Sequence, residues 1–365
     1  MCKKPQHNIL LTLRRELSTK GGVRAYWNSL LIEMKKYNSL NISIFEMGGH
    51  GKNIFGILKD QIKFHNNIKN QKYELAFLNP SLGKKSFFRD AIFAKQLIKK
   101  DIPFIVFFHG WDLIFEKQVD QKYKTFFLNS FGKAKKIFVL SNDFKIKILE
   151  WGYTGEIIIE TTNVDSSLLK NFSFDKKIEN IKQTNNIQIL FLARLLKEKG
   201  VFDTVEAFRN LNKKYKNIQL TIAGNGKDLD QLKQKVKNDN NIIVVGYVEG
   251  KKKIDLFTEQ HIYCFPTFYG EGLPTSILEA MAFGMPVITT NMGGLKKFFQ
   301  DEKMGYFVEP QNIDDLTRKL EKLLFNKNTI IEISNYNYNY AHRKLLNSVV
   351  SKRIYKHIKE VINGK

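Results

Sequence analysis

The residues with the clearest chemical potential lie in the segment from Pro266 to Ile288. Its pattern predicts the end of a strand, a glycine-bearing loop and a helix that begins near Thr275. The first amides of a helix lack partners within it and carry the positive end of its dipole, so we expect an anion there. The predicted contacts come from the turn itself: Gly272, Leu273, Pro274 and Thr275.

Two carboxylates, Glu271 and Glu279, stand eight positions apart around this turn. Carboxylates accept hydrogen bonds from hydroxyl groups, so each can hold a different part of a sugar or ribose ligand. The simpler interpretation is that Glu271 favours a helix N-terminus and that Glu279 is a solvated helix residue. The sequence leaves both interpretations open.

A second candidate is the cation pair Arg194 and Lys199, which follows the apolar run at 187–192. Arginine binds an anion through a two-pronged fork and lysine as a point charge, so a diphosphate is the expected ligand. The alternative is a solvated turn of a basic protein.

Glycines and a histidine complete the predicted site. Gly21 and Gly22 follow the first apolar run, and Gly224 opens a Gly-Asn-Gly turn, so the backbone can approach a ligand closely at both places. The glycine pair lacks the spacing of a dinucleotide-binding motif. His109 ends a run that is otherwise apolar, which fits either a ligand contact or a structural histidine.

The segment Asp228-Leu-Asp230 matches the D-x-D pattern of metal sites. It stands at an apparent helix start, where acidic residues are favoured in any case. Cys2 and Cys264 have neither metal-ligand nor disulfide spacing. We therefore predict neither a metal site nor a cofactor.

The elements that hold these residues alternate β-rich apolar runs with helical patterns. The runs lie at 8–13, 41–47, 73–79, 103–109, 136–141 and 157–161, and then at 187–192, 218–223, 242–248, 262–265, 287–290 and 306–308. This alternation predicts an α/β protein with two Rossmann-like, doubly wound parallel-sheet domains. Ligands bind at the carboxyl ends of such strands, so we expect the two domains to face a cleft.

The polar stretch at 166–186 is typical of a linker and gives the predicted domain boundary. The N-terminal domain is then 1–166 and the C-terminal domain 167–344. Apolar residues at helical spacing between 337 and 362 predict one long terminal helix. Its last part, about 345–365, is expected to fold back on the N-terminal domain.

Composition narrows the class of protein. The 365 residues are 43% hydrophobic, without an apolar run long enough to cross a bilayer and without a signal-peptide pattern, so we predict a cytoplasmic protein. The net charge of +23 fits solvated lysine-rich faces or an anionic membrane surface that carries a lipid-linked acceptor. Nucleic acid is not an expected partner, because we find no nucleic-acid-binding motif.

Together these segments resemble the large retaining glycosyltransferase group with the GT-B fold, called glycosyltransferase family 4. The resemblance covers nearly the whole chain, and Glu271 and Glu279 fit the E-x7-E spacing of that family. The other motifs occur in the family's order: Gly21-Gly22, His109, Asn163-Val-Asp165, Arg194 to Gly200, Gly224-Asn-Gly226, Gly246-Tyr-Val248 and Gly284-Met-Pro286.

The resemblance implies a metal-independent enzyme that moves a sugar from a UDP- or GDP-sugar to a glycan or lipid-linked acceptor in polysaccharide synthesis. It implies that Glu271 and His109 contact the donor sugar and that Glu279 holds the ribose. Arg194 and Lys199 would stabilise the departing diphosphate electrostatically. The glycine pair would lie near donor and acceptor.

The chain departs from the family pattern at Thr161-Thr162, where a proline is usual, and at Lys297, where an acidic residue is common. Two other classes of function stay open. One is a nucleotide-sugar epimerase or a phosphorylase on the same fold. The other is a non-catalytic polyanion-binding protein, which would show salt-sensitive affinity without turnover.

Overall fold

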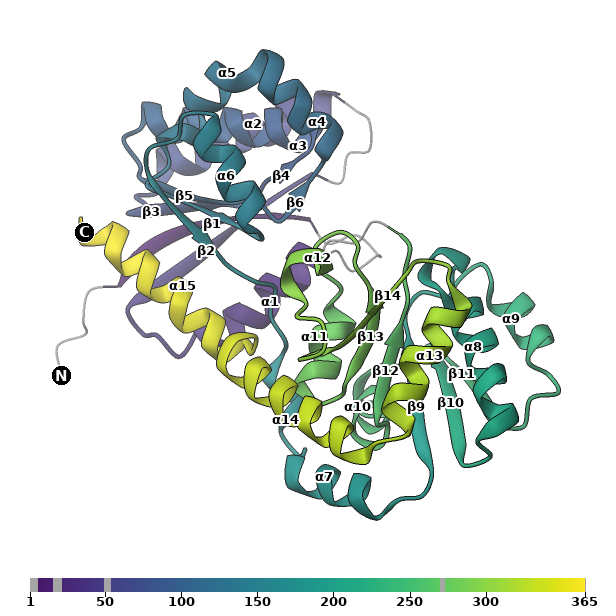
Figure 1. Ribbon diagram of the computed structural model, residues 1–365. Coiled ribbons are helices and arrows are strands. Elements are labelled where there is room, and N and C mark those ends of the chain that lie inside the picture. Colours follow the sequence, from purple (N-terminus) through teal and green to yellow (C-terminus); the bar gives the residue numbers. More distant parts are fainter. Residues whose placement is uncertain (1–5, 16–21, 49–53, 270–272, 365) are drawn as a thin grey trace. The chain divides into compact units, whose positions relative to one another are not determined.

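The computed structural model describes residues 6–15, 22–48, 54–269 and 273–364 (Figure 1). Contacts within the chain divide it into two units. Unit 1 comprises 1–162 and 350–365, and unit 2 comprises 163–349. Three of the predicted site residues, Gly21, Glu271 and Gly272, lie outside the described residues.

Unit 1 is built on a parallel sheet whose six described strands run in the order β2-β1-β3-β5-β7-β8. The central strands are apolar and buried, as expected where helices cover both faces of a parallel sheet. The strands are β1 (His7–Arg14), β2 (Leu40–Met47), β3 (Leu75–Leu78), β5 (Phe104–Phe107), β7 (Lys136–Val139) and β8 (Glu156–Ile159). A separate two-stranded sheet joins β4 (Ser81–Leu82) to β6 (Gly110–Trp111).

Two hydrophobic clusters cover the two faces of this sheet. One contains side chains of α1 and α15, and the other contains side chains of α2 to α6. The helices are α1 (Gly22–Met34), α2 (Ile54–Asn70), α3 (Lys84–Lys99), α4 (Leu113–Gln118), α5 (Lys124–Leu128), α6 (Asn142–Glu150) and α15 (Asn347–Ile362). Shorter helical turns lie at η1 (Val119–Tyr123) and η2 (Phe131–Lys133).

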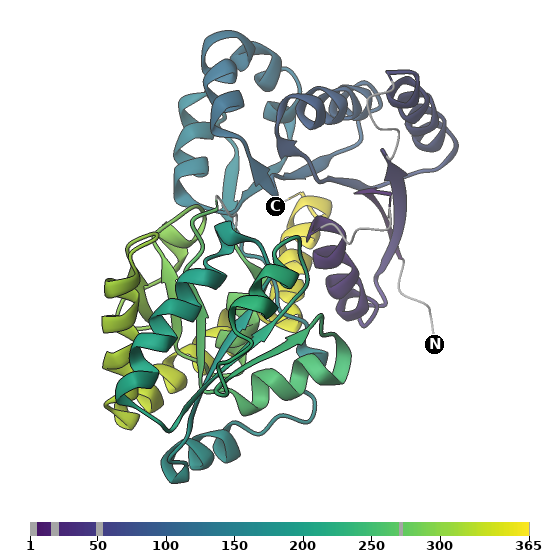
Figure 2. The same ribbon diagram turned by 90° about the vertical axis from the view of Figure 1, so that its right-hand side faces the viewer.

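Unit 2 repeats this plan around a second parallel sheet, with described strands in the order β11-β10-β9-β12-β13-β14. Figures 1 and 2 show helices on both faces of it, and Figure 2 views the same elements from the side. The strands are β9 (Ile187–Leu192), β10 (Ile218–Ala223), β11 (Ile242–Gly246), β12 (Ile262–Phe265), β13 (Val287–Thr290) and β14 (Gly305–Val308). The helices are α7 (Phe174–Gln183), α8 (Val201–Lys214), α9 (Leu229–Lys235), α10 (Gly250–Glu259), α11 (Thr275–Ala282), α12 (Leu295–Phe298), α13 (Ile313–Leu324) and α14 (Lys327–Lys344), with short turns η3 (Ser166–Leu169) and η4 (Lys197–Lys199).

The prediction of a linker at 166–186 is wrong. This stretch contains η3 and α7, and Ile181 on α7 is fully buried in the core of unit 2. Lys177, one turn earlier, is also buried, and its amino group donates a hydrogen bond to the Phe257 carbonyl oxygen at 2.6 Å. The segment therefore belongs to unit 2, although most of its residues are polar.

The unit boundary lies at 162/163 rather than 166/167. Val164 pairs with the chain near Leu346: its amide donates to the Leu345 carbonyl at 2.8 Å, and its carbonyl accepts from the Asn347 amide at 2.8 Å. These backbone bonds place Val164 in unit 2.

The prediction of one long terminal helix is also wrong, because α14 ends at Lys344 and α15 begins at Asn347. The backbone bonds to Val164 come from the two sides of this break, the Leu345 carbonyl and the Asn347 amide. Beyond the break, Val350, Ile354 and Ile358 pack against the sheet of unit 1. None of the helices in the described residues is long and apolar enough to span a membrane.

Candidate functional site

The carboxyl edge of the unit 2 sheet gathers most of the predicted site. Because β10, β9 and β12 are neighbours in the sheet, the loops that follow them emerge side by side. Gly224 follows β10, Arg194 follows β9, and the segment 266–269 follows β12. This edge is where ligands of open parallel sheets bind.

Lys199 is the more buried of the two predicted cations, with 3% of its surface exposed, whereas Arg194 is exposed. The Lys199 ammonium lies 4.3 Å from the centre of the Tyr269 ring, a cation–π contact. Burial, and then the charge of Arg194, lower the pKa of Lys199 to about 8. An anion that binds beside both cations would relieve this repulsion, which is the behaviour of a phosphate site.

Backbone hydrogen bonds hold the Lys199 loop in place. The carbonyl of Glu198 accepts from the amides of Phe268 at 3.0 Å and Tyr269 at 3.1 Å. Gly200 has a positive φ of 80°, and a Cβ there would lie 2.3 Å from the Pro266 carbonyl oxygen. The loops after β9 and β12 are thus joined directly, and only glycine fits at the junction.

Gly224 brings the loop after β10 against the same segment. Its φ is 144°, and a Cβ at this position would lie 1.8 Å from the Ala193 carbonyl oxygen. A carboxylate oxygen of Asp228 accepts from the Lys197 amide at 2.6 Å. Asp228 therefore holds two loops together, which accounts for the first acid of the D-x-D pattern without a metal.

The helix α11 begins at Thr275, with Leu273 and Pro274 before it and Pro274 at the N-cap. The described part of the predicted turn thus places a helix N-terminus after β12. The first amides of such a helix point outward without partners inside it.

Glu279, one turn into α11, is not a solvated helix residue. Only 14% of its side chain is exposed, and the Lys253 ammonium of α10 lies 2.7 Å from both of its carboxylate oxygens. Burial raises the pKa of Glu279, and the nearby Lys253 partly offsets this. Lys253 is a site residue that the sequence analysis missed, because nothing distinguishes it within the run Lys251-Lys252-Lys253.

Unit 1 has its own polar cluster at the carboxyl edge of its sheet. His109, two residues after β5, lies beside Asn79, which directly follows β3. Asn79 binds the backbone of the neighbouring β1 through its amide nitrogen, which donates to the Thr12 carbonyl at 3.0 Å. Its side-chain oxygen accepts from the Trp27 indole at 2.7 Å. Asn79 was missed, although the rule for strand ends would have found it in the predicted run 73–79.

His109 is held by the same oxygen, since its Nε2 lies 3.0 Å from Asn79 Oδ1. Because Asn79 Oδ1 is an acceptor, Nε2 carries the proton, and Nδ1 of the neutral ring is left as an acceptor. Burial lowers the pKa of His109 to about 3, so the ring is neutral near pH 7. This arrangement suits a hydrogen bond from a sugar hydroxyl rather than proton transfer. Gly22, also predicted here, is the first residue of α1.

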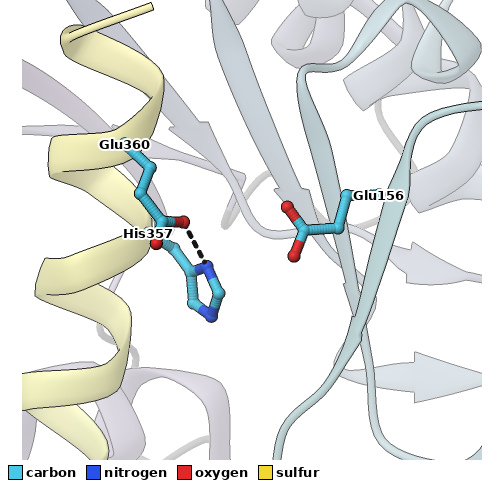
Figure 3. A group of neighbouring side chains, drawn as sticks. All are labelled: Glu156, His357 and Glu360. Atoms are coloured by element: carbon cyan, nitrogen blue, oxygen red, sulfur yellow. Dashed lines mark hydrogen bonds and ion pairs between the residues drawn. The ribbon is translucent and has the colours of Figure 1, made fainter. Parts of the chain in front are cut away.

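Among the described residues, one group has the spacing of metal ligands: Glu156, His357 and Glu360 in unit 1 (Figure 3). The ammonium of Lys136 contacts Glu360, lies 2.6 Å from Glu156 Oε2 and lies 3.2 Å from His357 Nδ1. The Lys136 ammonium already lies among these side chains. The group therefore forms an ion-pair network that links α15 to the sheet.

The comparison with known proteins agrees with this geometry. Residues 172–340, nearly all of unit 2, match the family described as glycosyl transferases group 1. Unit 2 is therefore similar to the group 1 glycosyltransferases over nearly its whole length. A glycosyltransferase of Methanocaldococcus jannaschii is 30% identical over 208 residues, which are 56% of this chain and 51% of that protein.

Another relative is the capsular polysaccharide biosynthesis glycosyltransferase CapM of Staphylococcus aureus. It is 23% identical over 228 residues, which are 61% of this chain and 57% of CapM. The chain spans about half the length of the curated relatives it matches. The crystal structure of Anabaena HepE in complex with UDP is similar with a TM-score of 0.70 and 14% identity, over 97% of this chain and 100% of that one. Such structures show that the fold is that of the GT-B glycosyltransferases.

Proposed function

We propose that this protein is a retaining, metal-independent glycosyltransferase that uses a UDP- or GDP-sugar. The observation that carries the proposal is the convergence of Arg194, Lys199, the N-terminus of α11 and Glu279 at the carboxyl edge of one parallel sheet. In the proposal, the two cations and the helix dipole stabilise the departing nucleoside diphosphate. Glu279 accepts hydrogen bonds from the ribose hydroxyls.

The transferred sugar is assigned to His109, whose Nδ1 is the available acceptor, and to Glu271, which stays a sequence prediction. The acceptor is proposed to be a glycan or a lipid-linked molecule of cell-surface polysaccharide synthesis, on the cytoplasmic side of the membrane. The name of CapM supports the polysaccharide, and the UDP complex of HepE supports the nucleotide.

A thermal-shift screen tests the donor. UDP, GDP and their sugars are compared on wild type and on Glu279→Gln, with inorganic pyrophosphate as the control for a general anion effect. A ligand at 100 times its Kd stabilises the native state by about 2.7 kcal/mol, so the matching nucleotide should raise Tm by several degrees. The shift should be smaller in Glu279→Gln.

Turnover of the matching donor is then measured with and without EDTA, and we expect equal rates. Loss of activity in EDTA with recovery in manganese would contradict metal independence. Release of sugar phosphate that depends on inorganic phosphate would indicate a phosphorylase. A 2-epimer of the donor sugar that forms without acceptor would indicate a nucleotide-sugar epimerase. No response to any nucleotide would sink the proposal.

A further inference from the structure

The outer helices of unit 1 expose apolar side chains among lysines. On α2, Phe55, Leu58 and Ile62 have 80%, 53% and 63% of their surface exposed. Their spacing of three and four residues puts them on one stripe of the helix. The opposite stripe of α2, with Phe64 and Ile68, is buried in the core of unit 1.

Lysines border this apolar stripe, and α3 continues it. The helices lie side by side (Figure 1), joined by a hydrogen bond from the Gln96 side-chain amide to the side-chain oxygen of Gln61 at 2.9 Å. Together they expose two isoleucines and several lysines besides the α2 stripe: Lys59, Lys63, Lys69, Lys84, Lys85, Ile92, Lys95, Ile98 and Lys99. We call these residues, with Phe55, Leu58 and Ile62, the α2–α3 surface.

The α2–α3 surface has no exposed carboxylate on either helix. Within 54–70 the one acid is Asp60, and within 84–99 it is Asp90, and both are buried. Asp60 accepts a hydrogen bond from the Gly48 amide, and Asp90 pairs with Arg89. The positive charge of this surface is therefore not neutralised by acids on its own helices.

We propose that the α2–α3 surface docks on an anionic lipid bilayer. Lysines near such a membrane are attracted to its headgroups, while large apolar side chains on the same helix face enter the boundary with the acyl chains. A protein partner fits less well, since lysine is depleted in protein–protein interfaces. The surface deepens the proposed function, on which it rests for its purpose: it would hold the enzyme where a lipid-linked acceptor is found.

The test uses the full chain and sedimentation with vesicles, without any nucleotide sugar. Vesicles are of phosphatidylcholine alone or mixed with phosphatidylglycerol. Wild type should bind the mixed vesicles, and increasing salt should weaken the binding. Lys59→Gln with Lys63→Gln should weaken it by about 30-fold, at ~1 kcal/mol for each lysine near the surface. Phe55→Ser with Ile62→Ser should weaken it by at least 10-fold.

Matched controls lie in unit 2. Lys233→Gln with Lys237→Gln repeats the spacing of the lysine pair, and Phe325→Ser removes a phenylalanine that is 71% exposed. Controls should bind as wild type does, and all variants should keep the wild-type Tm because the changed side chains are exposed.

The proposal would be overturned if the α2–α3 surface variants bound as wild type does, or if the controls lost as much binding as these variants. It would also be overturned if wild type bound neutral vesicles as well as anionic ones. A change of oligomeric state in Phe55→Ser with Ile62→Ser, with vesicle binding unchanged, would also overturn it in favour of a protein interface. Glycosyl transfer to a detergent-solubilised acceptor is measured separately. If the protein transfers sugar but does not bind vesicles, only the proposal for the α2–α3 surface is rejected. If it binds vesicles but does not transfer sugar, the proposed glycosyltransferase function is rejected.

Discussion

At the scale of single residues, Glu279 shows how a carboxylate is kept ready for a ligand. Its burial favours the protonated form, and Lys253 at 2.7 Å favours the ionised form. The charged form is the stronger acceptor for ribose hydroxyls. In the function that we propose, Lys253 acts on the nucleotide through Glu279, as a positioning residue.

Lys253→Met should weaken nucleotide binding in a pH-dependent way. Without the ammonium, the pKa of Glu279 rises further, so as pH falls the affinity should begin to decrease at a higher pH than in wild type. Glu279→Gln, which loses the charged acceptor altogether, should bind about 10- to 100-fold more weakly. Calorimetric Kd values for the matching nucleotide across pH measure both effects.

Lys253→Arg should restore the wild-type pH profile, and Lys251→Met on the same helix, whose lysine pairs with Asp255, should not change it. A loss of affinity in Lys253→Met that is the same at every pH would mean that Lys253 supports the fold and not the ionisation of Glu279.

Lys199 should make nucleotide affinity depend on pH in the opposite direction to Glu279. Its pKa of about 8 lies below the ordinary value for lysine, because burial and Arg194 disfavour its charge. Affinity for the nucleoside diphosphate should therefore fall as pH rises above about 8. Lys199→Ala should lose this dependence and about 2–4 kcal/mol of transition-state stabilisation, measured as kcat/KM. If wild type and Lys199→Ala show the same alkaline slope, another group is responsible.

At the scale of elements, α15 is held to unit 1 by apolar packing and by charge. Arg353 binds Glu160 with two nitrogens. Lys136 contacts Glu156, His357 and Glu360, the three residues that Figure 3 draws. Burial lowers the pKa of Lys136, but the hydrogen bonds that its ammonium donates to Glu156 and Glu360 outweigh this effect, and the pKa is raised overall. The hydrogen bond from Lys136 lowers the pKa of Glu360.

Glu360→Gln should reduce the free energy of unfolding by about 1 kcal/mol, a modest value because Glu360 is partly solvated. A lowered carboxyl pKa contributes stability above the unfolded value of about 4.3, and this contribution is lost as pH falls through the folded value. The difference between variant and wild type should therefore be present at pH 7 and disappear in acid.

Urea unfolding at several pH values measures this difference. Lys356→Met is the control, because Lys356 is exposed and lies 3.8 Å from Glu360. If the difference in unfolding free energy between Glu360→Gln and wild type persists unchanged in acid, Glu360 stabilises the protein through packing and not through charge.

At the scale of the whole molecule, the net charge of +23 has a local counterpart on unit 1. The α2–α3 surface shows lysines beside exposed apolar side chains, with the acids of both helices buried. Net charge alone predicts only attraction to polyanions. The joint exposure of apolar and basic groups is what favours a membrane over nucleic acid.

The sequence by itself determined the order of the strands along the chain and the identity of the fold. Each of the twelve predicted runs overlaps one strand of the two large sheets, because strands buried on both faces must be apolar throughout. It also indicated His109, Arg194 and Lys199, since a polar or charged residue at the end of such a strand is conspicuous.

Tertiary structure alone decided which polar residues are buried and which apolar ones are exposed. A polar stretch became α7 because Ile181 and Lys177 face the core, and Glu279 acquired Lys253 from a helix 26 positions earlier in the chain. On α2, Phe64 and Phe55 look equally apolar in sequence, yet one is buried and the other exposed. The local sequence pattern indicates the hydrophobic periodicity of an element. The orientation of the element and its contacts depend on segments that are distant in the sequence.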